Sequence, residues 1–442
     1  MQKYHLAVDI GASSGRHIIA WRENEEMVMK EVYRFQNLPD EADGDLIWDL
    51  ERLCREVVNG MRACKEAGYV PNTIGIDTWA VDYVLLDEAN QPILPLYCYR
   101  DKRGAEGAEL VHEIIPFAKL YEHTGIQYQP FNTIYQMYWD KKEGRLDKAS
   151  DFLMLPEYLS FYLSGKKEHE YTNASSTGLL DAKKCNWDQE IIETLGFPKK
   201  LFEKAPMKPP ITLGGLKEEI ANEVGFNCEV VLPATHDTAS AIAALPYKGG
   251  AYISSGTWSL LGAELAAPIT GEAAQRANFT NEGGIGTIRF LKNIMGLWLV
   301  QCLKRELNDE YSFAELAKMA REEAKFDYHL DVNADCYLAP KSIRKVIDEE
   351  CGAKTWPIPN SPGQYAHAIY QSLAHAYAQA IDELEEITGQ KFDRLCIVGG
   401  GANNTYLNEL TEKAIGRPVV TGSPEATALG NLLVQEEAIK NV

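Results

Sequence analysis

Small and charged side chains gather near the start of the chain, where Asp9 precedes the run Gly11, Ala12, Ser13, Ser14, Gly15, Arg16. Glycine lets backbone N–H groups approach an anion, serine hydroxyls add donors, and arginine supplies a positive charge. A carboxylate such as Asp9 at the end of an apolar run suits a hydrated Mg²⁺. The run fits a phosphate cradle. An ordinary tight hairpin is the alternative, because no Gly-Lys-Ser/Thr ending of a Walker A loop follows.

A second glycine-rich turn lies near the other end, where Gly399, Gly400 and Gly401 follow an apolar run. Bare backbone after a buried strand and before a helix gives room for a nucleotide at the helix amides. A dinucleotide-binding turn is the competing interpretation. It needs spaced glycines and an acidic residue closing the next strand, and residues 418–420 are followed by none. Mononucleotide binding fits this turn better.

A carboxylate stands at a third junction, in the run Thr235, His236, Asp237, Thr238 between a predicted strand and a predicted helix. A helix start favours the ionised form of Asp237, and an ionised carboxylate can accept a hydroxyl proton. Asp is also an ordinary helix-capping residue, which is the structural alternative. Two phosphate-type turns with a carboxylate between them together indicate transfer of a phosphoryl group to a hydroxyl.

Strands and helices alternate around these residues, which predicts an α/β sheet architecture. Leu53, Val57 and Met61 are spaced for one face of a helix. The expected elements of the first half are strands over 4–9, 16–21, 31–35, 73–78, 83–87 and 229–233, and helices over 49–67 and 239–245. Those near the C-terminus are strands over 394–398 and 418–420, and helices over 402–415 and 425–435.

Proline and paired glycine at 246–250 punctuate the chain and predict a boundary between a domain over 1–245 and a domain over 246–442. Residues 6–16 and 251–261 both show an apolar strand entering a small, hydroxyl-rich turn. A duplicated fold explains this similarity, and two unrelated glycine hairpins are the alternative.

The composition excludes several classes of protein. The 442 residues carry 44 basic and 64 acidic side chains, a net charge of −20, which disfavours nucleic acid and anionic membranes as partners. The beginning shows no leader pattern and no run of about 18 apolar residues occurs, so a cytoplasmic location is expected. Nine cysteines without a C-x-x-C pair indicate neither a disulfide framework nor a zinc knuckle.

Ten short strings, in order along the chain, resemble the FGGY carbohydrate kinases, whose fold is that of actin and hexokinase-like ATPases. They are AVDIGASSGR (7–16), IGIDTWAVDYVLLD (74–87), YRD (99–101), GIQYQPFNTIYQ (125–136), EYTNAS (170–175), HDTASA (236–241), YISSGTWSL (252–260), NEGG (281–284), LKNIMGLW (291–298) and IVGGGANN (397–404).

The resemblance implies an α/β fold of two RNase H-like domains flanking a catalytic cleft. It implies an N-terminal sugar-binding and catalytic domain and a C-terminal nucleotide-binding domain. The implied reaction is phosphorylation of L-rhamnulose at O1 by ATP, with Mg²⁺, giving L-rhamnulose 1-phosphate and ADP in rhamnose catabolism. Another ketose such as L-fuculose is one alternative, and an actin- or chaperone-like ATPase switch is another.

The resemblance also carries roles to individual positions. Asp237 is similar to the general base, and Asp9 to the Mg²⁺-associated carboxylate. The implied ATP-binding positions are Ala12, Ser13, Ser14, Gly15, Arg16, Thr257, Gln301 and Gly401, and the implied sugar-binding positions are Ala80, His236, Asp237, Thr238 and Asn293. Relatives have glycine where this chain has Ala80, which bears on ketose selectivity.

Two further expectations concern partners and cations. Small-molecule substrates without nucleic acid or membrane, and a monomer or weak homo-oligomer, are expected. Arg289 and Lys292 fit either a role in neutralising phosphate charge or simple ion pairing with acidic neighbours.

Overall fold

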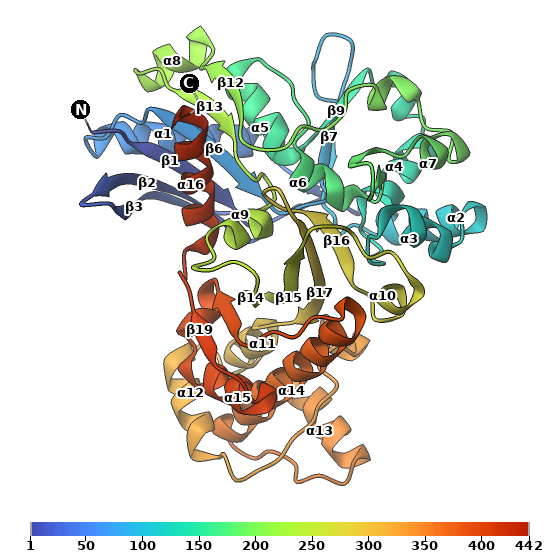
Figure 1. The fold of residues 1–442 in the computed structure, drawn as a ribbon, viewed down its shortest axis with the longest axis vertical. Coiled ribbons are helices and arrows are strands. Elements are labelled where there is room, and N and C mark those ends of the chain that lie inside the picture. Colours follow the sequence, from blue (N-terminus) through green and yellow to red (C-terminus); the bar gives the residue numbers. More distant parts are fainter. Residues whose placement is uncertain (1, 441–442) are drawn as a thin grey trace. The chain divides into compact units, whose positions relative to one another are not determined.

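The computed structural model describes residues 2–440, and the chain divides into two compact units. The first unit comprises the chain up to Ala244, Leu265–Arg289 and the residues from Thr427 onward. The second comprises Leu245–Glu264 and Phe290–Ala426. The C-terminal helix α16 (Ala426–Lys440, red in Figure 1) therefore belongs, but for its first residue, to the same unit as the N-terminal strands (blue).

The secondary structure of the first unit alternates as expected. Its strands are β1 (His5–Ile10), β2 (Ser14–Glu23), β3 (Glu26–Gln36), β4 (Asp40–Ala42), β5 (Asp45–Trp48), β6 (Thr73–Thr78), β7 (Tyr83–Leu86), β8 (Leu96–Tyr97), β9 (Asp151–Met154), β10 (Leu180–Asp181), β11 (Asn186–Trp187), β12 (Ile211–Gly215), β13 (Glu229–Leu232) and β16 (Thr280–Gly283). Its α-helices, besides α16, are α1 (Leu50–Glu66), α2 (Arg103–Ile114), α3 (Phe117–Thr124), α4 (Thr133–Lys142), α5 (Leu155–Ser164), α6 (Tyr171–Ala174), α7 (Gln189–Thr194), α8 (Glu218–Val224), α9 (Asp237–Ala243) and α10 (Glu272–Arg276).

The central sheet of this unit has the strand order β12-β13-β6-β1-β2-β3. β1 and β2 form the expected antiparallel hairpin, and β3 extends it. β6 runs parallel to β1, and β13 runs parallel to β6. Parallel neighbours bring the carboxyl ends of β1, β6 and β13 to one edge of the sheet, where open α/β sheets bind ligands.

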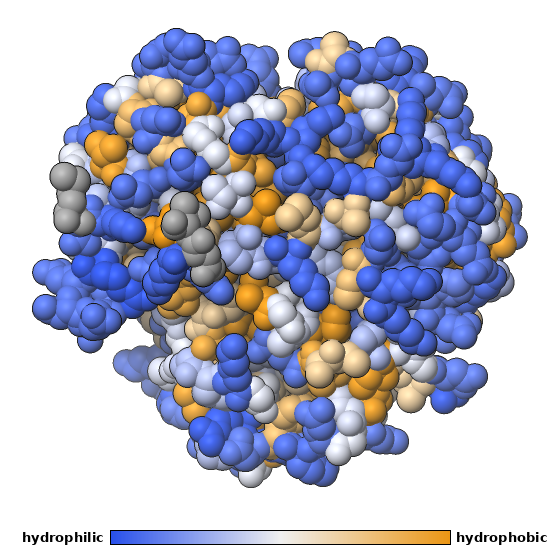
Figure 2. Space-filling model, turned by 45° about the horizontal axis from the view of Figure 1, so that its top comes forward, coloured by the Kyte–Doolittle hydropathy of each residue, from blue (hydrophilic) through white to orange (hydrophobic). Residues whose placement is uncertain are grey.

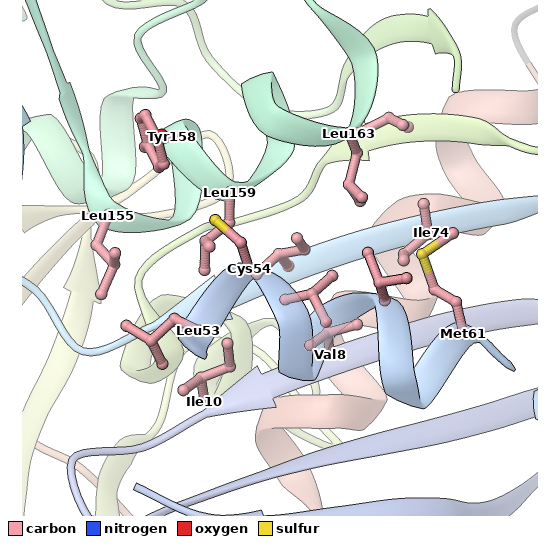
Figure 3. Packing of buried hydrophobic residues seen from close by; sticks show 14 of the residues in the cluster. Val8, Ile10, Leu53, Cys54, Met61, Ile74, Leu155, Tyr158, Leu159 and Leu163 are labelled. Atoms are coloured by element: carbon pink, nitrogen blue, oxygen red, sulfur yellow. The ribbon is translucent and has the colours of Figure 1, made fainter. Parts of the chain in front are cut away.

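Helix α1 covers one face of the sheet, as its apolar spacing predicts. Asp49 caps it, since its carboxylate accepts a hydrogen bond of 2.8 Å from the N–H of Arg52. Figure 3 shows Leu53 and Met61 of α1 packing with Val8 of β1 and with Leu159 of α5. Burial of each such side chain contributes about 1.5–3 kcal/mol, so this layer fixes the strands that carry Asp9 and Asp77.

Helix α16 covers the other face of β1 and β2 (Figure 1), where Leu432 packs with Ala7 and Ile18. Polar contacts also tie this helix to the sheet. Asn431 Nδ2 donates to the carbonyl of Gly75 at 3.2 Å, and Gln435 Nε2 donates to the carbonyl of Leu6 at 3.1 Å.

The second unit is built on a sheet whose strands follow one another in the order β17-β15-β14-β18-β19. Its strands are β14 (Ala251–Ser255), β15 (Trp258–Leu265), β17 (Ile288–Met295), β18 (Leu395–Val398) and β19 (Val419–Thr421). Its α-helices are α11 (Trp298–Glu306), α12 (Phe313–Glu322), α13 (Ile343–Ala353), α14 (Pro362–Thr388) and α15 (Thr405–Ile415).

The two central sheets share one arrangement, which agrees with duplication. In each, an antiparallel hairpin (β1/β2 or β14/β15) is followed by two parallel neighbours (β6 and β13, or β18 and β19). Several expected boundaries are wrong. β3 begins at Glu26 and not at residue 31, and α16 extends to Lys440 and not only to residue 435. The helix predicted from Ala402 begins at Thr405, because a 3₁₀ turn occupies Gly400–Asn403 and the side chain of Asn404 caps α15.

Hydrophilic residues cover most of the face of the molecule shown in Figure 2, as the charged composition predicts. Within the part of the chain that the structure describes, no helix is both long enough and apolar enough to cross a bilayer.

Candidate functional site

The turn between β1 and β2 is closed by its own backbone and by Asn37. The N–H of Gly11 donates to the carbonyl of Ser14 at 2.9 Å, and Asn37 Nδ2 donates to the carbonyl of Gly11 at 2.9 Å. Ser13 is exposed, whereas Ala12 and Ser14 are half-buried. Gly15 is required for packing, because a Cβ there would lie 2.2 Å from the ring of Phe35. The result is a rigid turn with a serine hydroxyl at its tip.

Asp9 and Arg16 form an ion pair across this hairpin. Nε and Nη2 of Arg16 donate to Oδ2 of Asp9 at 3.0 and 2.8 Å. Arg16 is thus engaged by the carboxylate and is 23% exposed at its side chain. A carboxylate at the end of a strand, beside a turn of glycine and serine, suits a magnesium ion that keeps several waters, so the residues present fit this metal.

Asp77 adds a second carboxylate, which sequence reasoning missed. It pairs in register with Asp9 on the neighbouring strand β6 and is fully buried. Asn431 Nδ2 donates to its Oδ2 at 2.5 Å, and its Oδ1 has no hydrogen-bond partner among the described residues. Burial, and next the charge of Asp9, raise its pKa well above the ordinary value. The alignment of two aspartates at parallel strand ends was the signal available in the sequence.

The junction carrying Asp237 is held by a buried carboxylate, Glu170. Oε2 of Glu170 accepts hydrogen bonds from the N–H and Oγ1 of Thr235 at 3.1 and 2.6 Å, and from Oγ1 of Thr172 at 2.6 Å. The N–H of Thr78 also donates to the carbonyl of Thr235 at 3.0 Å. These bonds anchor the segment that follows β13 against β6.

Asp237 is the first residue of α9, and His236 occupies the capping position, so the interpretation of Asp237 as a helix cap is not supported. Its Oδ1 accepts from the N–H and Oγ1 of Thr238 at 2.5 and 3.1 Å. The side chain is 32% exposed, yet surrounding protein removes enough water to raise its pKa. Burial, then the charge of Asp9, raise the pKa of Asp237 to about 7. Such a carboxyl can exchange a proton near neutral pH.

His236 connects Asp237 with a buried ion pair. Its Nε2 lies 3.4 Å from Oδ1 of Asp237, and its Nδ1 lies 3.0 Å from Nη2 of Arg289. The same Nη2 donates to Oε2 of Glu282 at 3.0 Å. Burial, then the charge of Arg289, lower the pKa of His236 well below its ordinary value. Of the two roles considered for Arg289, ion pairing is the one found.

Ala80 lies in the short loop between β6 and β7 and is half-buried. The next residue, Val81, has φ of +73°, a conformation that is strained for a β-branched residue. Its carbonyl accepts from Oγ1 of Thr133 at 2.8 Å. Asp82 accepts from the indole N–H of Trp79 at 2.9 Å, so Trp79 is packed and hydrogen-bonded. These contacts hold the loop in place.

In the second unit, the predicted nucleotide residues gather at the carboxyl end of β14. Thr257 is exposed in the β14–β15 turn, and its carbonyl accepts from the N–H of Trp298 at 3.2 Å, at the start of the helix that carries Gln301. Gly401 packs on β14, because a Cβ there would lie 1.9 Å from Oγ of Ser255. The structure thus brings Thr257, Gln301 and Gly401 to one region of this unit.

Asn293 also belongs to the second unit, on β17, and its Oδ1 is buried without a hydrogen-bond partner among the described residues. This unit also contains a cluster of three side chains of the types that bind metals, separate from Asp9. Ligand atoms of Asp327, His329 and His375 lie within 4.8 Å of one another. Asp9 is not part of that group.

Two solved structures with the same fold are each 17% identical in sequence to this chain. Gluconate kinase from Lactobacillus acidophilus matches with a TM-score of 0.79, covering 100% of this chain and 90% of that chain. Xylulose kinase from the same organism matches with a TM-score of 0.77 and the same coverage and identity. The fold is the two-domain α/β fold of these kinases, and the expected fold class is confirmed.

Models of the "FGGY family of carbohydrate kinases", N-terminal and C-terminal domains, match residues 4–244 and 251–438. The chain belongs to the FGGY family of carbohydrate kinases. Curated relatives named rhamnulokinase are similar over almost the whole chain. Those from Oceanobacillus iheyensis and Halalkalibacterium halodurans are both 44% identical, covering 100% and 99% of this chain and 94% of each relative. That from Bacillus subtilis is 42% identical, covering 99% of this chain and 91% of the relative.

Proposed function

We propose that this carbohydrate kinase transfers the γ-phosphoryl group of ATP to O1 of L-rhamnulose, giving L-rhamnulose 1-phosphate and ADP in rhamnose catabolism. The name shared by its relatives supports the substrate. The observation that carries the chemistry is Asp237, a carboxyl whose pKa is raised to about 7 and which follows the carboxyl end of β13, one of the parallel strands β1, β6 and β13. An ATPase switch without a sugar acceptor has no comparable support, because the family is one of carbohydrate kinases.

In this proposal Asp237 is the general base. Oδ1 already accepts two hydrogen bonds from Thr238. Among the described residues of the first unit none donates a hydrogen bond to Oδ2, which leaves that oxygen to accept the proton of the sugar hydroxyl as the phosphoryl group arrives. Phosphoryl transfer needs positioning and electrostatic stabilisation more than covalent chemistry, so one placed base is sufficient.

The remaining roles are those that the resemblance to the family implies. Ala80, His236 and Thr238 in the first unit and Asn293 in the second are the proposed sugar-binding residues. Ala12 to Arg16, Thr257, Gln301 and Gly401 are the proposed ATP-binding residues. Asp9 would hold Mg²⁺, which when bound neutralises charge on the phosphate oxygens. We assign sugar binding and catalysis to residues 1–245 and nucleotide binding to residues 246–442.

We also propose a cytoplasmic monomer or weak homo-oligomer with small-molecule substrates and no nucleic acid or membrane partner. The net charge of −20 supports this, since it repels phosphate backbones and anionic lipid surfaces.

A coupled assay of ADP release tests the proposal with L-rhamnulose, L-fuculose, D-xylulose, L-ribulose and no sugar. We expect kcat/KM for L-rhamnulose to exceed that for the other ketoses by about 10-fold or more, since a hydrogen-bonding site rejects sugars that leave its polar groups unpaired. A higher kcat/KM for another ketose would show that this ketose, and not L-rhamnulose, is the preferred substrate. ADP release that is independent of sugar would contradict the kinase activity. The variant Ala80→Gly, assayed in parallel, measures how far the methyl group sets this selectivity.

A further inference from the structure

The side chains of Glu282 and Arg289 lie beside His236 and bear on which nitrogen of its imidazole ring carries the proton. A neutral imidazole carries one proton, either on Nδ1 or on Nε2, and the partner of one nitrogen decides which. Arg289 cannot accept a hydrogen bond, because a guanidinium has only donors. Two groups face Nδ1 of His236: Nη2 of Arg289 at 3.0 Å and Oε2 of Glu282 at 3.4 Å. The guanidinium is the nearer of the two and the only one of them within hydrogen-bond geometry, so we take Nδ1 as the acceptor, with the proton on Nε2.

Two further contacts fix Arg289 in this position. Nη2 also donates to Oε2 of Glu282 at 3.0 Å, and Nε donates to the carbonyl of Gly283 at 2.8 Å. The residue is fully buried, and the pair occupies β16 and the start of β17, close to the junction after β13. A buried guanidinium held by a carboxylate stays charged and has little freedom to turn away. Glu282 therefore orients the donor that His236 faces.

The tautomer of His236 affects the carboxylate of Asp237. With its proton on Nε2, His236 presents an N–H at 3.4 Å from Oδ1 of Asp237. Oδ1 already accepts from the N–H and Oγ1 of Thr238. The two hydrogen bonds and the electrostatic attraction of this N–H thus act on one oxygen, which stabilises Oδ1 and leaves Oδ2 to accept a proton. The other tautomer would turn an unprotonated nitrogen toward the carboxylate and repel it.

We propose that Glu282 and Arg289 are positioning residues that hold His236 as the Nε2–H tautomer, so that Oδ2 of Asp237 is the atom that accepts the hydroxyl proton. The assignment of Oδ2 rests on the proposed function of Asp237. The assignment of the tautomer does not, since it is a property of the protein without substrate.

The decisive measurement is the ¹⁵N spectrum of the imidazoles in protein labelled at histidine. Long-range ¹H–¹⁵N correlations distinguish the two tautomers and the imidazolium, and the signal of His236 is identified by its loss in His236→Gln. We expect the Nε2–H pattern in the wild-type protein near neutral pH. The Nδ1–H pattern or an imidazolium would overturn the proposal, whether or not any variant folds.

Variants test whether Arg289 is what sets the tautomer of His236. Arg289→Met should abolish the single Nε2–H pattern, and Arg289→Lys should retain it, because an ammonium also donates to Nδ1. Glu282→Gln should retain the tautomer and broaden its signal as Arg289 loses its anchor. Arg103→Met is the matched control: it removes another buried guanidinium, which pairs with Asp140 at 3.0 Å, and should leave the His236 signal unchanged. An unaltered tautomer in Arg289→Met, or an equal change in Arg103→Met, would contradict the assigned cause.

Kinetics separates positioning from a general loss of structure. Arg289→Met should lower kcat for the sugar by about 10- to 100-fold, the usual scale for a residue that orients a catalytic group, with KM for ATP nearly unchanged. Arg289→Lys should recover most of this loss. A fall in kcat that lysine does not recover would contradict positioning. If the tautomer is as expected but no ketose is phosphorylated, the proposed function fails and the tautomer assignment stands.

Discussion

Asp9 and Asp77 occupy paired positions on the parallel strands β1 and β6, and the charge of Asp9 raises the pKa of both Asp77 and Asp237. Asp9 is itself held by an arginine, Arg16. The parallel register, and not the spacing in sequence, brings these carboxyls under one another's influence. Asp9 is therefore expected to influence both the metal and the base.

The variant Asp9→Asn tests that double role. Loss of the negative charge should lower the pKa of Asp237, because ionisation of Asp237 is no longer opposed. The acid limb of the pH profile of kcat/KM, which we expect near pH 7 in the wild type from the pKa of about 7, should move to lower pH. The Mg²⁺ concentration for half-maximal rate should rise by about 10-fold or more, since a ligand is weakened.

A matched substitution at Asp188 controls for loss of a buried carboxylate. Asp188 is buried, caps α7 and pairs with His123, and it lies outside the proposed site. Asp188→Asn should leave both the acid limb and the Mg²⁺ requirement unchanged. An unchanged acid limb in Asp9→Asn, or the same shift in both variants, would refute the coupling between Asp9 and Asp237.

The pH dependence of stability provides a second prediction. The pKa of Asp237 is about 7 in the folded chain and has its ordinary value near 3.8 in the unfolded chain. The folded state thus binds more protons between these values, so the contribution of Asp237 to stability is full below about pH 4 and is lost as pH rises through about 7. Asn cannot ionise. Asp237→Asn should therefore gain stability relative to wild type between about pH 5 and pH 8.

Thermal unfolding without metal or nucleotide measures this difference. The shift in Tm between Asp237→Asn and wild type should become more positive toward alkaline pH. A difference in Tm between the two proteins that is the same at about pH 5 and about pH 8 would show that the carboxyl is not held protonated in the folded chain.

The glycine turn of the second unit gives a steric prediction. A Cβ on Gly401 would meet Oγ of Ser255 at 1.9 Å, whereas a Cβ on Gly400 would meet nothing within 4 Å. Gly401→Ala should cost about 1–3 kcal/mol of stability and raise KM for ATP, because overpacking displaces the turn. Gly400→Ala should change neither. The double variant Gly401→Ala with Ser255→Gly should recover part of both losses, and equal effects of the two alanines would contradict the packing argument.

Local patterns allowed much of the fold to be predicted. The apolar spacing of Leu53, Val57 and Met61 predicted α1 to within one residue at each end. The strand-turn-strand pattern around Gly11 predicted the first hairpin. The start of α15 was wrong because Asn404 competes as a cap with the glycine turn, and side-chain capping is hard to place from sequence alone.

The contacts around Asp237 were less accessible from sequence. Glu282 and Arg289 are more than 40 residues from His236, and no periodicity links residues brought together by neighbouring elements. The strained φ of Val81 likewise has no signal in its residue type, since valine avoids that conformation. The contacts around Asp237 and the conformation of Val81 both depend on strand pairing and burial. Strand pairing and burial are properties of the folded chain and cannot be read from single residue types.

The central claim is that Asp237 removes the proton from the sugar hydroxyl, and one comparison tests it most directly. ADP release is measured for wild type and Asp237→Asn at saturating ATP, Mg²⁺ and L-rhamnulose, with the Kd for ATP measured separately. The account predicts a fall in kcat of roughly 10²–10⁴ with the Kd for ATP nearly unchanged, as expected when a general base is lost. Turnover of Asp237→Asn near the wild-type rate would contradict it.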